Sequence, residues 1–271
     1  MIRKIVAVAV LAAMTQTAGA QLKENKYHSP IKVEKKWKKY NPGEVEFTDK
    51  APETEGSKIY HRIIPNPIPY IQENALRVLQ TLYYGPKDKN IPQLKHIYYS
   101  LIDQDGVSWK YGGGDHVGVC YTTGWIEKSF KGQDTMRLDY ETRGVLYHEL
   151  THAYQLEPKG CGTYGDGGEY WCFIEGMADA VRLTCGCFEQ DFNSKDRPKG
   201  DSWRKGYRVT GYFLYWLQQN KDKNFLRKFN ASANEINPWS WDAAMKHVLG
   251  DKPENGVDAL WDEYLHAIGD K

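Results

Sequence analysis

The stretch GVLYHELTHAYQ, residues 144–155, is the part of this chain from which fold and chemistry are best predicted. Apolar residues surround two histidines spaced four apart, and no proline or further glycine interrupts the run, which is typical of a helix. On a helix, positions i and i+4 lie one above the other, so His148 and His152 share a face. Two imidazoles arranged in this way can bind one metal ion, and Glu149 can reach a water on that ion. The stretch therefore predicts a helix that carries a zinc site.

A second run, FIEGMADAVR at residues 173–182, offers carboxylates for the same site. Glu175 on a neighbouring helix would complete a site of two histidines and one carboxylate, with a position left for water. Asp179, one turn further along the same face, can accept a hydrogen bond from a liganding imidazole. The reverse assignment, with Asp179 as the ligand and Glu175 as its support, stays open on spacing alone. Simpler interpretations are a helix-dipole role for Glu175 and a local pair between Asp179 and Arg182.

This set of donors predicts hydrolysis by a metal-activated water. Zinc lowers the pKa of a bound water toward about 7, and Glu149 would act as the general base that takes its proton. A further donor is needed for the oxyanion, and Tyr207, at the start of a predicted helix, is the candidate. Its position alone favours ordinary core packing. The prediction is a peptidase with one zinc ion, held by His148, His152 and Glu175.

Length and composition exclude several classes of protein. The 271 residues fit one large domain or two small ones. The 36 basic residues are balanced by 35 acidic ones, which argues against a nucleic-acid-binding protein. After the N-terminus there is no stretch of roughly 18 apolar residues, so no membrane span is predicted.

The first twenty residues have the three parts of a signal peptide. Arg3 and Lys4 form a charged start, Ile5–Met14 is apolar but too short to span a bilayer, and Ala18–Ala20 offers a small-residue cleavage site. Residues 1–20 are therefore predicted to direct the protein to the periplasm or out of the cell.

The residues that follow the signal peptide divide into two parts. Residues 21–58 are rich in Lys and Glu and predict a polar N-terminal arm, with a peripheral strand near residues 31–33. Residues 59–271 are predicted to form the peptidase domain. Within this domain Cys161 and Cys172 flank a glycine-rich loop and are a candidate disulfide in an oxidising compartment.

Within the domain, strand patterns come before helix patterns. After a helix at residues 69–84, strands are predicted at 95–103, 107–110 and 116–126. Helices are then predicted at 140–156, 173–184, 205–220, 224–230, 240–249 and 257–268. Strands followed by helices predict an α+β domain.

Four segments together resemble a known family. They are residues 144–155, 174–182 and 200–210, and the tail around Leu260 and Trp261. In their order and spacing they resemble the basic secretory proteins of plants and bacteria, which are classed as zincin-type zinc metallopeptidases. The resemblance extends over roughly residues 60–268.

The resemblance implies a zincin-like fold, in which a mixed sheet covers the active-site helix and a mostly helical C-terminal half follows. It implies an edge strand within residues 116–126 that lines the cleft and pairs with a peptide or protein substrate bound as an extended strand. It also favours Glu175 over Asp179 as the third ligand. The loop at residues 160–170, between the two ligand helices, is expected to shape one side of the cleft.

Two other functions compete with that of a secreted zinc endopeptidase. The same site could serve an exopeptidase, although no sequence feature marks a pocket for a free terminus. The many Tyr and Trp residues also allow a secreted glycan- or cell-wall-binding protein with a structural or vestigial zinc site. A structural zinc in such a binding protein would have four protein ligands and no open position for water.

Overall fold

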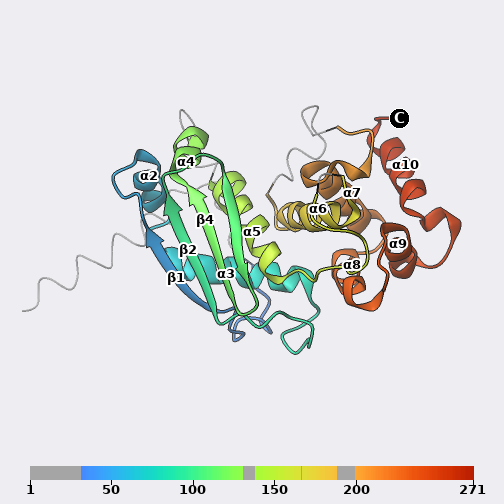
Figure 1. Ribbon diagram of the computed structural model, residues 1–271, viewed down its shortest axis with the longest axis horizontal. Coiled ribbons are helices and arrows are strands. Elements are labelled where there is room, and N and C mark those ends of the chain that lie inside the picture. Colours follow the sequence, from blue (N-terminus) through green and yellow to red (C-terminus); the bar gives the residue numbers. More distant parts are fainter. Residues whose placement is uncertain (1–31, 131–137, 166, 188–198) are drawn as a thin grey trace, which may run out of the picture.

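The structure is a computed structural model that describes residues 32–130, 138–165, 167–187 and 199–271. The predicted signal peptide lies outside the described residues. A four-stranded mixed sheet forms one half of the molecule and a group of helices forms the other, as expected for an α+β fold (Figure 1). Among the described residues, no helix is long and apolar enough to cross a membrane.

The sheet has the strand order β1-β2-β4-β3. Its strands are β1 (Glu44–Asp49), β2 (His96–Ile102), β3 (Ser108–Gly113) and β4 (His116–Thr122). The first three strands in this order are parallel, and β3 runs antiparallel to β4. A tight turn joins β3 to β4, and Gly114 adopts there a φ of +67°, which favours glycine.

The edge strand differs from the expectation. The residues predicted to hold it, 116–126, form the interior strand β4 and then helix α4 (Thr123–Phe130), whereas β3 is the edge strand beside the cleft. Six of the seven residues of β4 are buried, while no residue of β3 is fully buried. An apolar run of this kind is typical of a strand covered on both faces, so it marks the centre of the sheet and not its edge.

The segment from 44 to 49, which the composition assigns to the polar arm, forms β1 and pairs with β2. Residues 32 and 33 are not in a strand, so the strand of this region lies further along the chain than predicted. The chain is also anchored by Trp37, whose side chain is fully buried. Two helices, α2 (Glu55–Ile63) and α3 (Pro67–Leu82), connect β1 to β2.

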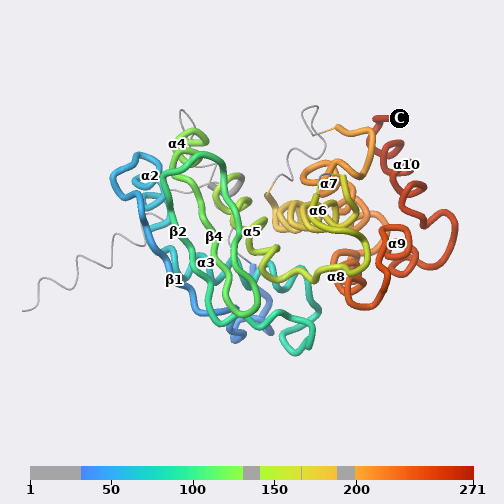
Figure 2. The backbone as a smooth tube through the Cα atoms, in the orientation of Figure 1, coloured from blue at the N-terminus to red at the C-terminus, as the bar shows by residue number. Residues whose placement is uncertain are grey.

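The helices of the second half are close to those expected. A π-helical turn at Leu138–Arg143 leads into α5 (Gly144–Tyr154). The others are α6 (Glu169–Thr184), α7 (Tyr207–Asn220), α8 (Phe225–Glu235), α9 (Trp241–Leu249) and α10 (Val257–Ile268). The tube in Figure 2 shows α5 between the sheet and the remaining helices, and α5 contacts both β3 and α6. This position makes α5 the helix shared by the two halves.

Helices α6 and α7 approach closely because glycines lie between them. A Cβ atom added to Gly211 would lie 2.7 Å from the Cβ of Asp179, and one added to Gly176 would lie 2.5 Å from Cγ2 of Thr210. These contacts set the position of the α6 face that carries Glu175 and Asp179.

The predicted disulfide between Cys161 and Cys172 is absent, and all five cysteines are free thiols. Cys172 is fully buried on α6, where its side chain belongs to the core. Cys161 lies on the preceding loop, with its sulfur 3.9 Å from the carbonyl oxygen of Pro158. The two side chains therefore have different surroundings, although they flank the same loop.

Candidate active site

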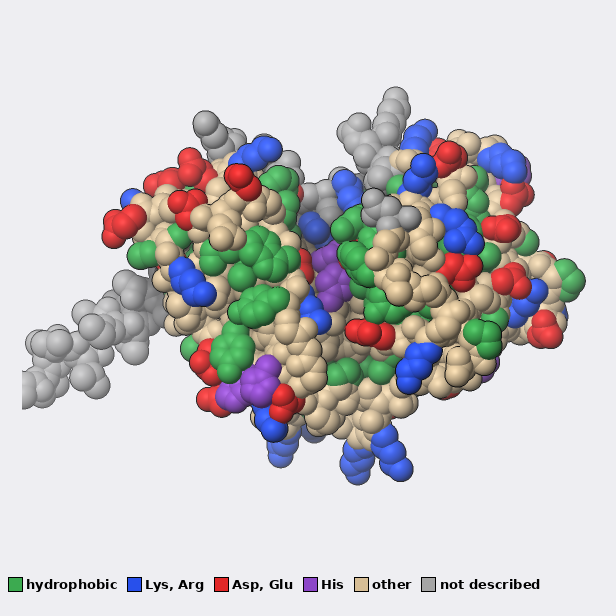
Figure 3. Space-filling model, in the orientation of Figure 1, with side chains coloured by type: hydrophobic (Ala, Val, Ile, Leu, Met, Phe, Trp, Pro, Cys, Tyr) green, Lys and Arg blue, Asp and Glu red, His purple; other side chains and the backbone are tan. Residues whose placement is uncertain are grey.

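A groove separates the sheet half from the helical half, and histidine side chains lie at its base (Figure 3). The cavity has a volume of about 890 Å³. It is lined by β3, by the helices α5, α6 and α7, and by the loop before α6. The predicted site residues His148, Glu149, His152, Glu175 and Asp179 all line this cavity, together with Tyr207.

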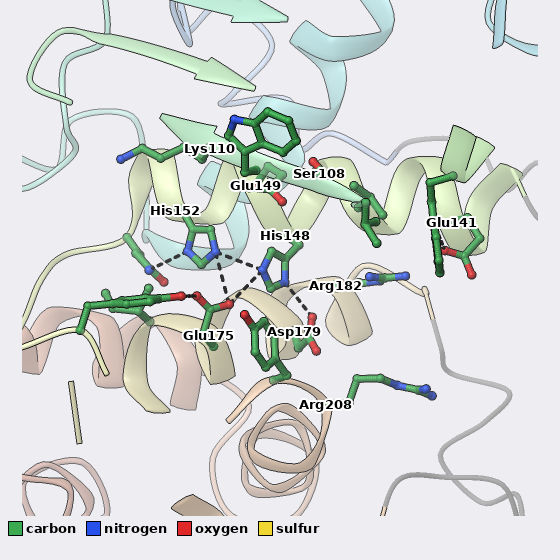
Figure 4. Close-up of a pocket in the computed structure, with 18 of the residues that line it drawn as sticks. Ser108, Lys110, Glu141, His148, Glu149, His152, Glu175, Asp179, Arg182 and Arg208 are labelled. Atoms are coloured by element: carbon green, nitrogen blue, oxygen red, sulfur yellow. Dashed lines mark hydrogen bonds and ion pairs between the residues drawn. The ribbon is translucent and has the colours of Figure 1, made fainter. Parts of the chain in front are cut away.

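The two histidines face each other across one turn of α5, as the spacing predicts. Their Nε2 atoms are 3.0 Å apart. The Oε2 atom of Glu175, from α6, lies 3.1 Å from Nε2 of His148 and 3.6 Å from Nε2 of His152 (Figure 4). These three residues form a group that could bind a metal ion, since their ligand atoms all lie within 4.8 Å of one another.

Asp179 lies on the other side of the His148 ring. Nδ1 of His148 donates a hydrogen bond of 2.8 Å to Oδ1 of Asp179, and the aspartate side chain is buried. This bond keeps the proton on Nδ1 and leaves Nε2 directed into the cavity. Glu175 therefore faces the Nε2 atoms of the two histidines, whereas Asp179 holds Nδ1 of His148.

The protonation of this cluster follows from its contacts. Burial lowers the pKa of His148, but the hydrogen bonds to Asp179 and Glu175 outweigh it and raise that pKa to about 10. Burial raises the pKa of Glu175, and the two imidazoles outweigh this effect and hold its pKa well below the usual range. The carboxylates that face His148 therefore favour a positive charge at this position.

Two buried oxygens support a fit to a metal ion. Apart from the imidazoles that face it, Oε2 of Glu175 has no hydrogen-bond partner among the described residues, and Oε1 of Gln155 is buried without a donor. The amide nitrogen of Gln155 lies 3.1 Å from Nδ1 of His152. Exchange of the amide oxygen and nitrogen would let Oε1 accept from Nδ1–H, which leaves the Nε2 lone pair of His152 directed into the cavity. Two imidazole nitrogens and one carboxylate oxygen then converge, a donor set typical of zinc.

Glu149 is placed apart from the three converging donors. In Figure 4 it lies on the β3 side of the two histidines, whereas Glu175 lies on the α6 side. Its side chain is buried and lines the cavity. It can therefore face a water held by the three donors without displacing any of them.

Tyr207 lines the cavity and is exposed, whereas its position in the sequence alone favoured core packing. Its ring stacks on His148 with a centroid distance of 6.0 Å, and it meets Trp171 edge-on at 5.5 Å. Its residue accessibility is 47%, and its φ of +41° is unusual for a residue other than glycine. Partial burial raises the pKa of its hydroxyl, as does the charge of Glu175, so the hydroxyl stays a donor at neutral pH.

Two further residues of the site were not predicted from the sequence. Gln155 follows His152 by three positions, a helical spacing that signals a possible contact. Tyr164 comes from the loop before α6, and its hydroxyl donates a hydrogen bond of 2.5 Å to Oε1 of Glu175. No periodic pattern marks a loop residue, so the sequence carries no signal for Tyr164.

Comparison with known proteins agrees with this chemistry. A family model described as peptidase of plants and bacteria matches residues 43–264. No curated protein and no solved structure gives a significant match. The chain therefore belongs to this peptidase family of plants and bacteria, as its resemblance to the basic secretory proteins predicted.

Proposed function

We propose that this protein is a secreted, zinc-dependent endopeptidase. The observation that carries the proposal is the convergence of Nε2 of His148, Nε2 of His152 and Oε2 of Glu175 at the base of the groove. Two histidines and one carboxylate leave an open position on zinc, which is the arrangement of a catalytic site. A structural zinc would need a fourth protein ligand, and the described residues place none among these three.

Each residue near the three donors has a distinct task. His148, His152 and Glu175 would hold the zinc ion, and Asp179 and Gln155 would orient the imidazoles. When bound, zinc makes a water acidic and polarises the scissile carbonyl.

Glu149 accepts the proton of the attacking water and then donates it to the leaving amine. The hydroxyl of Tyr207 donates a hydrogen bond to the oxyanion that forms at the carbonyl. Its ring lies over His148, so this hydroxyl is carried close to the three metal-facing atoms.

The edge of β3 supports binding of an extended substrate. Ser108, Trp109 and Lys110 line the cavity, and among the described strands only β4 pairs with β3. The outer edge of β3 therefore offers backbone groups to a peptide that adds as a further strand. A site along a strand edge can be occupied by an internal segment of a protein, which favours an endopeptidase over an exopeptidase.

Secretion is proposed from residues 1–20, whose charged, apolar and small-residue parts follow the order of a signal peptide. Export through this signal would place the enzyme in the periplasm or outside the cell.

The glycan-binding alternative rested on exposed aromatic residues. None of the nine tryptophans is exposed, and six of them are at most 6% accessible: Trp37, Trp171, Trp203, Trp216, Trp239 and Trp241. The tryptophans therefore do not favour sugar stacking. In the described part of the chain four tyrosines are exposed, and two of them, Tyr164 and Tyr207, line the cavity of the candidate site.

The test combines metal content with peptide cleavage. Wild-type protein, His152→Ala and Glu149→Gln would be analysed by metal mass spectrometry and with casein and mixed peptides. We expect one zinc per chain in wild type and Glu149→Gln, loss of zinc in His152→Ala, and cleavage by wild type alone. Wild-type protein without zinc, or full activity in Glu149→Gln, would refute the proposal. Blocked and free-ended peptides, compared in the same assay, distinguish an endopeptidase from an exopeptidase.

A further inference from the structure

Tyr164 reaches the site from a loop and contacts a carboxylate that faces the metal position. Its hydroxyl donates to Oε1 of Glu175 at 2.5 Å, while Oε2 of the same carboxylate faces the two imidazoles. The Glu175 side chain is buried, but the residue accessibility of Tyr164 is 58%. A largely exposed side chain therefore makes a polar contact with a buried carboxylate of the site.

The loop that carries Tyr164 is attached firmly at its start. The carbonyl oxygen of Lys159 accepts a hydrogen bond of 2.8 Å from the amide of Trp239, and Gly160 packs closely against Pro238. Beyond this point the backbone has few close neighbours, since a Cβ atom added to Gly162 would have no atom within 4 Å apart from those of the adjoining residues. The hydrogen bond to Glu175 thus ties the middle of the loop to the site.

This contact also constrains the carboxylate. A glutamate can bind a metal through one oxygen or through both, and rotation about its last side-chain bond interchanges the two. A donor on Oε1 restricts this rotation and so keeps Oε2 as the metal-facing atom. Apart from the two imidazoles, Tyr164 is the side chain among the described residues that donates to this carboxylate.

We infer that Tyr164 is a positioning residue: its hydroxyl holds Glu175 in the orientation that binds through Oε2, and so sets how tightly the metal is retained. The inference rests on the proposed zinc site. It makes the loop that carries Tyr164 part of the metal centre, although the ligands themselves come from α5 and α6.

The test measures zinc affinity in Tyr164→Phe, by competition with a chromophoric chelator. Removal of an outer hydrogen-bond partner of a metal ligand weakens metal binding by about 10- to 100-fold, and this is the expected loss. The visible spectrum of the Co²⁺-substituted protein should also change, because a freed Oε1 alters the coordination of the metal. Tyr164→Phe keeps the ring, and the exposed position makes a folding defect a minor concern.

Tyr170→Phe is the matched control. Tyr170 lines the same cavity, and its hydroxyl donates a hydrogen bond of 2.9 Å to Oε2 of Glu157, which is not one of the three grouped donors. It should keep the zinc affinity and the Co²⁺ spectrum of wild type.

Three results would overturn the inference. Unchanged zinc affinity and an unchanged Co²⁺ spectrum in Tyr164→Phe would show that the hydroxyl does not position Glu175, even if turnover fell. An equal loss of affinity in both variants would point to a general effect on the cavity. Wild-type protein that binds no zinc would refute the proposed function and the positioning role with it, an outcome that the wild-type measurement identifies separately.

Discussion

At the scale of single residues, the two histidines differ in what holds their outer nitrogens. Nδ1 of His148 donates to the carboxylate of Asp179 at 2.8 Å, while Nδ1 of His152 lies 3.1 Å from the amide of Gln155. Hydrogen bonds to an ionised group are roughly twice as strong as those between neutral groups. The orientation of His148 is therefore the more strongly held of the two.

This difference predicts unequal effects of substitution. Asp179→Asn should weaken zinc binding by about 10- to 100-fold, because it removes the charge that orients His148 while keeping the shape of the side chain. Gln155→Ala should weaken zinc binding by a smaller factor. Competition with a chelator measures both, and a larger loss in Gln155→Ala would contradict the assignment.

Tyr207 leads to a separate kinetic prediction. Tyr207→Phe keeps the stacking on His148 and removes only the hydroxyl. Loss of one oxyanion donor lowers kcat by about 100- to 1000-fold, and we expect KM and zinc content to stay near those of wild type. Steady-state kinetics with one defined peptide tests this. A rise in KM at constant kcat would instead show that the hydroxyl binds the substrate in its ground state.

At the scale of helices and strands, the contact between α6 and α7 determines where the carboxylates lie. Gly211→Ala would place a methyl group 2.7 Å from Cβ of Asp179 and 3.2 Å from the backbone nitrogen of Ala180. Neither neighbour is the end of a flexible side chain, so the helices must separate. Overpacking of this kind costs about 1–3 kcal/mol, and the gain of about 1 kcal/mol in helix propensity offsets only part of that range.

We therefore expect Gly211→Ala to lower the free energy of unfolding by up to about 2 kcal/mol and also to weaken zinc binding, since Asp179 moves. Urea unfolding and chelator competition measure the two effects. Gly124→Ala is the control, because Gly124 lies in α4 and an added Cβ meets nothing within 4 Å. Equal effects of the two substitutions would refute the packing argument.

The elements themselves were predicted unevenly. Long amphipathic helices such as α7 and α10 were recognised because their pattern is repeated over several turns. The start of α6 at Glu169 was missed by four positions, since it depends on contacts from elsewhere: Glu169 accepts hydrogen bonds from the backbone of Trp241 and from Arg204. The edge strand was misplaced because apolar content marks a buried strand and carries no information about its neighbours.

At the scale of the whole molecule, the three donors span the two halves. His148 and His152 belong to α5, which packs on the sheet, and Glu175 belongs to α6 in the helical half (Figure 1). A metal ion held by all three would link the halves across the groove.

Zinc should therefore stabilise the folded protein. At a free zinc concentration 100 times the Kd, the gain is about 2.7 kcal/mol, which for a domain of this size raises the Tm by about 5–10 °C. Differential scanning calorimetry with and without a chelator measures the shift. His152→Ala should show a much smaller response, and an equal response in that variant would mean that zinc binds elsewhere.

Local geometry accounts for the features that the sequence alone determines. Residues four apart on a helix share a face whatever surrounds them, so the spacing of His148 and His152 and the adjacent Glu149 predicted directly the helix that carries the candidate metal site. The family also followed from short, ordered segments of the chain. These features depend on contacts within one helix or one segment.

The rest depends on how segments far apart in the chain meet. Glu175 and Asp179 lie on the same helical face, and their spacing does not say which one meets the imidazoles from inside the groove. The placement of α6 against α5 and α7 makes that choice. In the same way Tyr164 reaches Glu175 because the folded loop before α6 brings it to the wall of the cavity. Distances between elements are set by packing of the entire core, and no local pattern of residues encodes them.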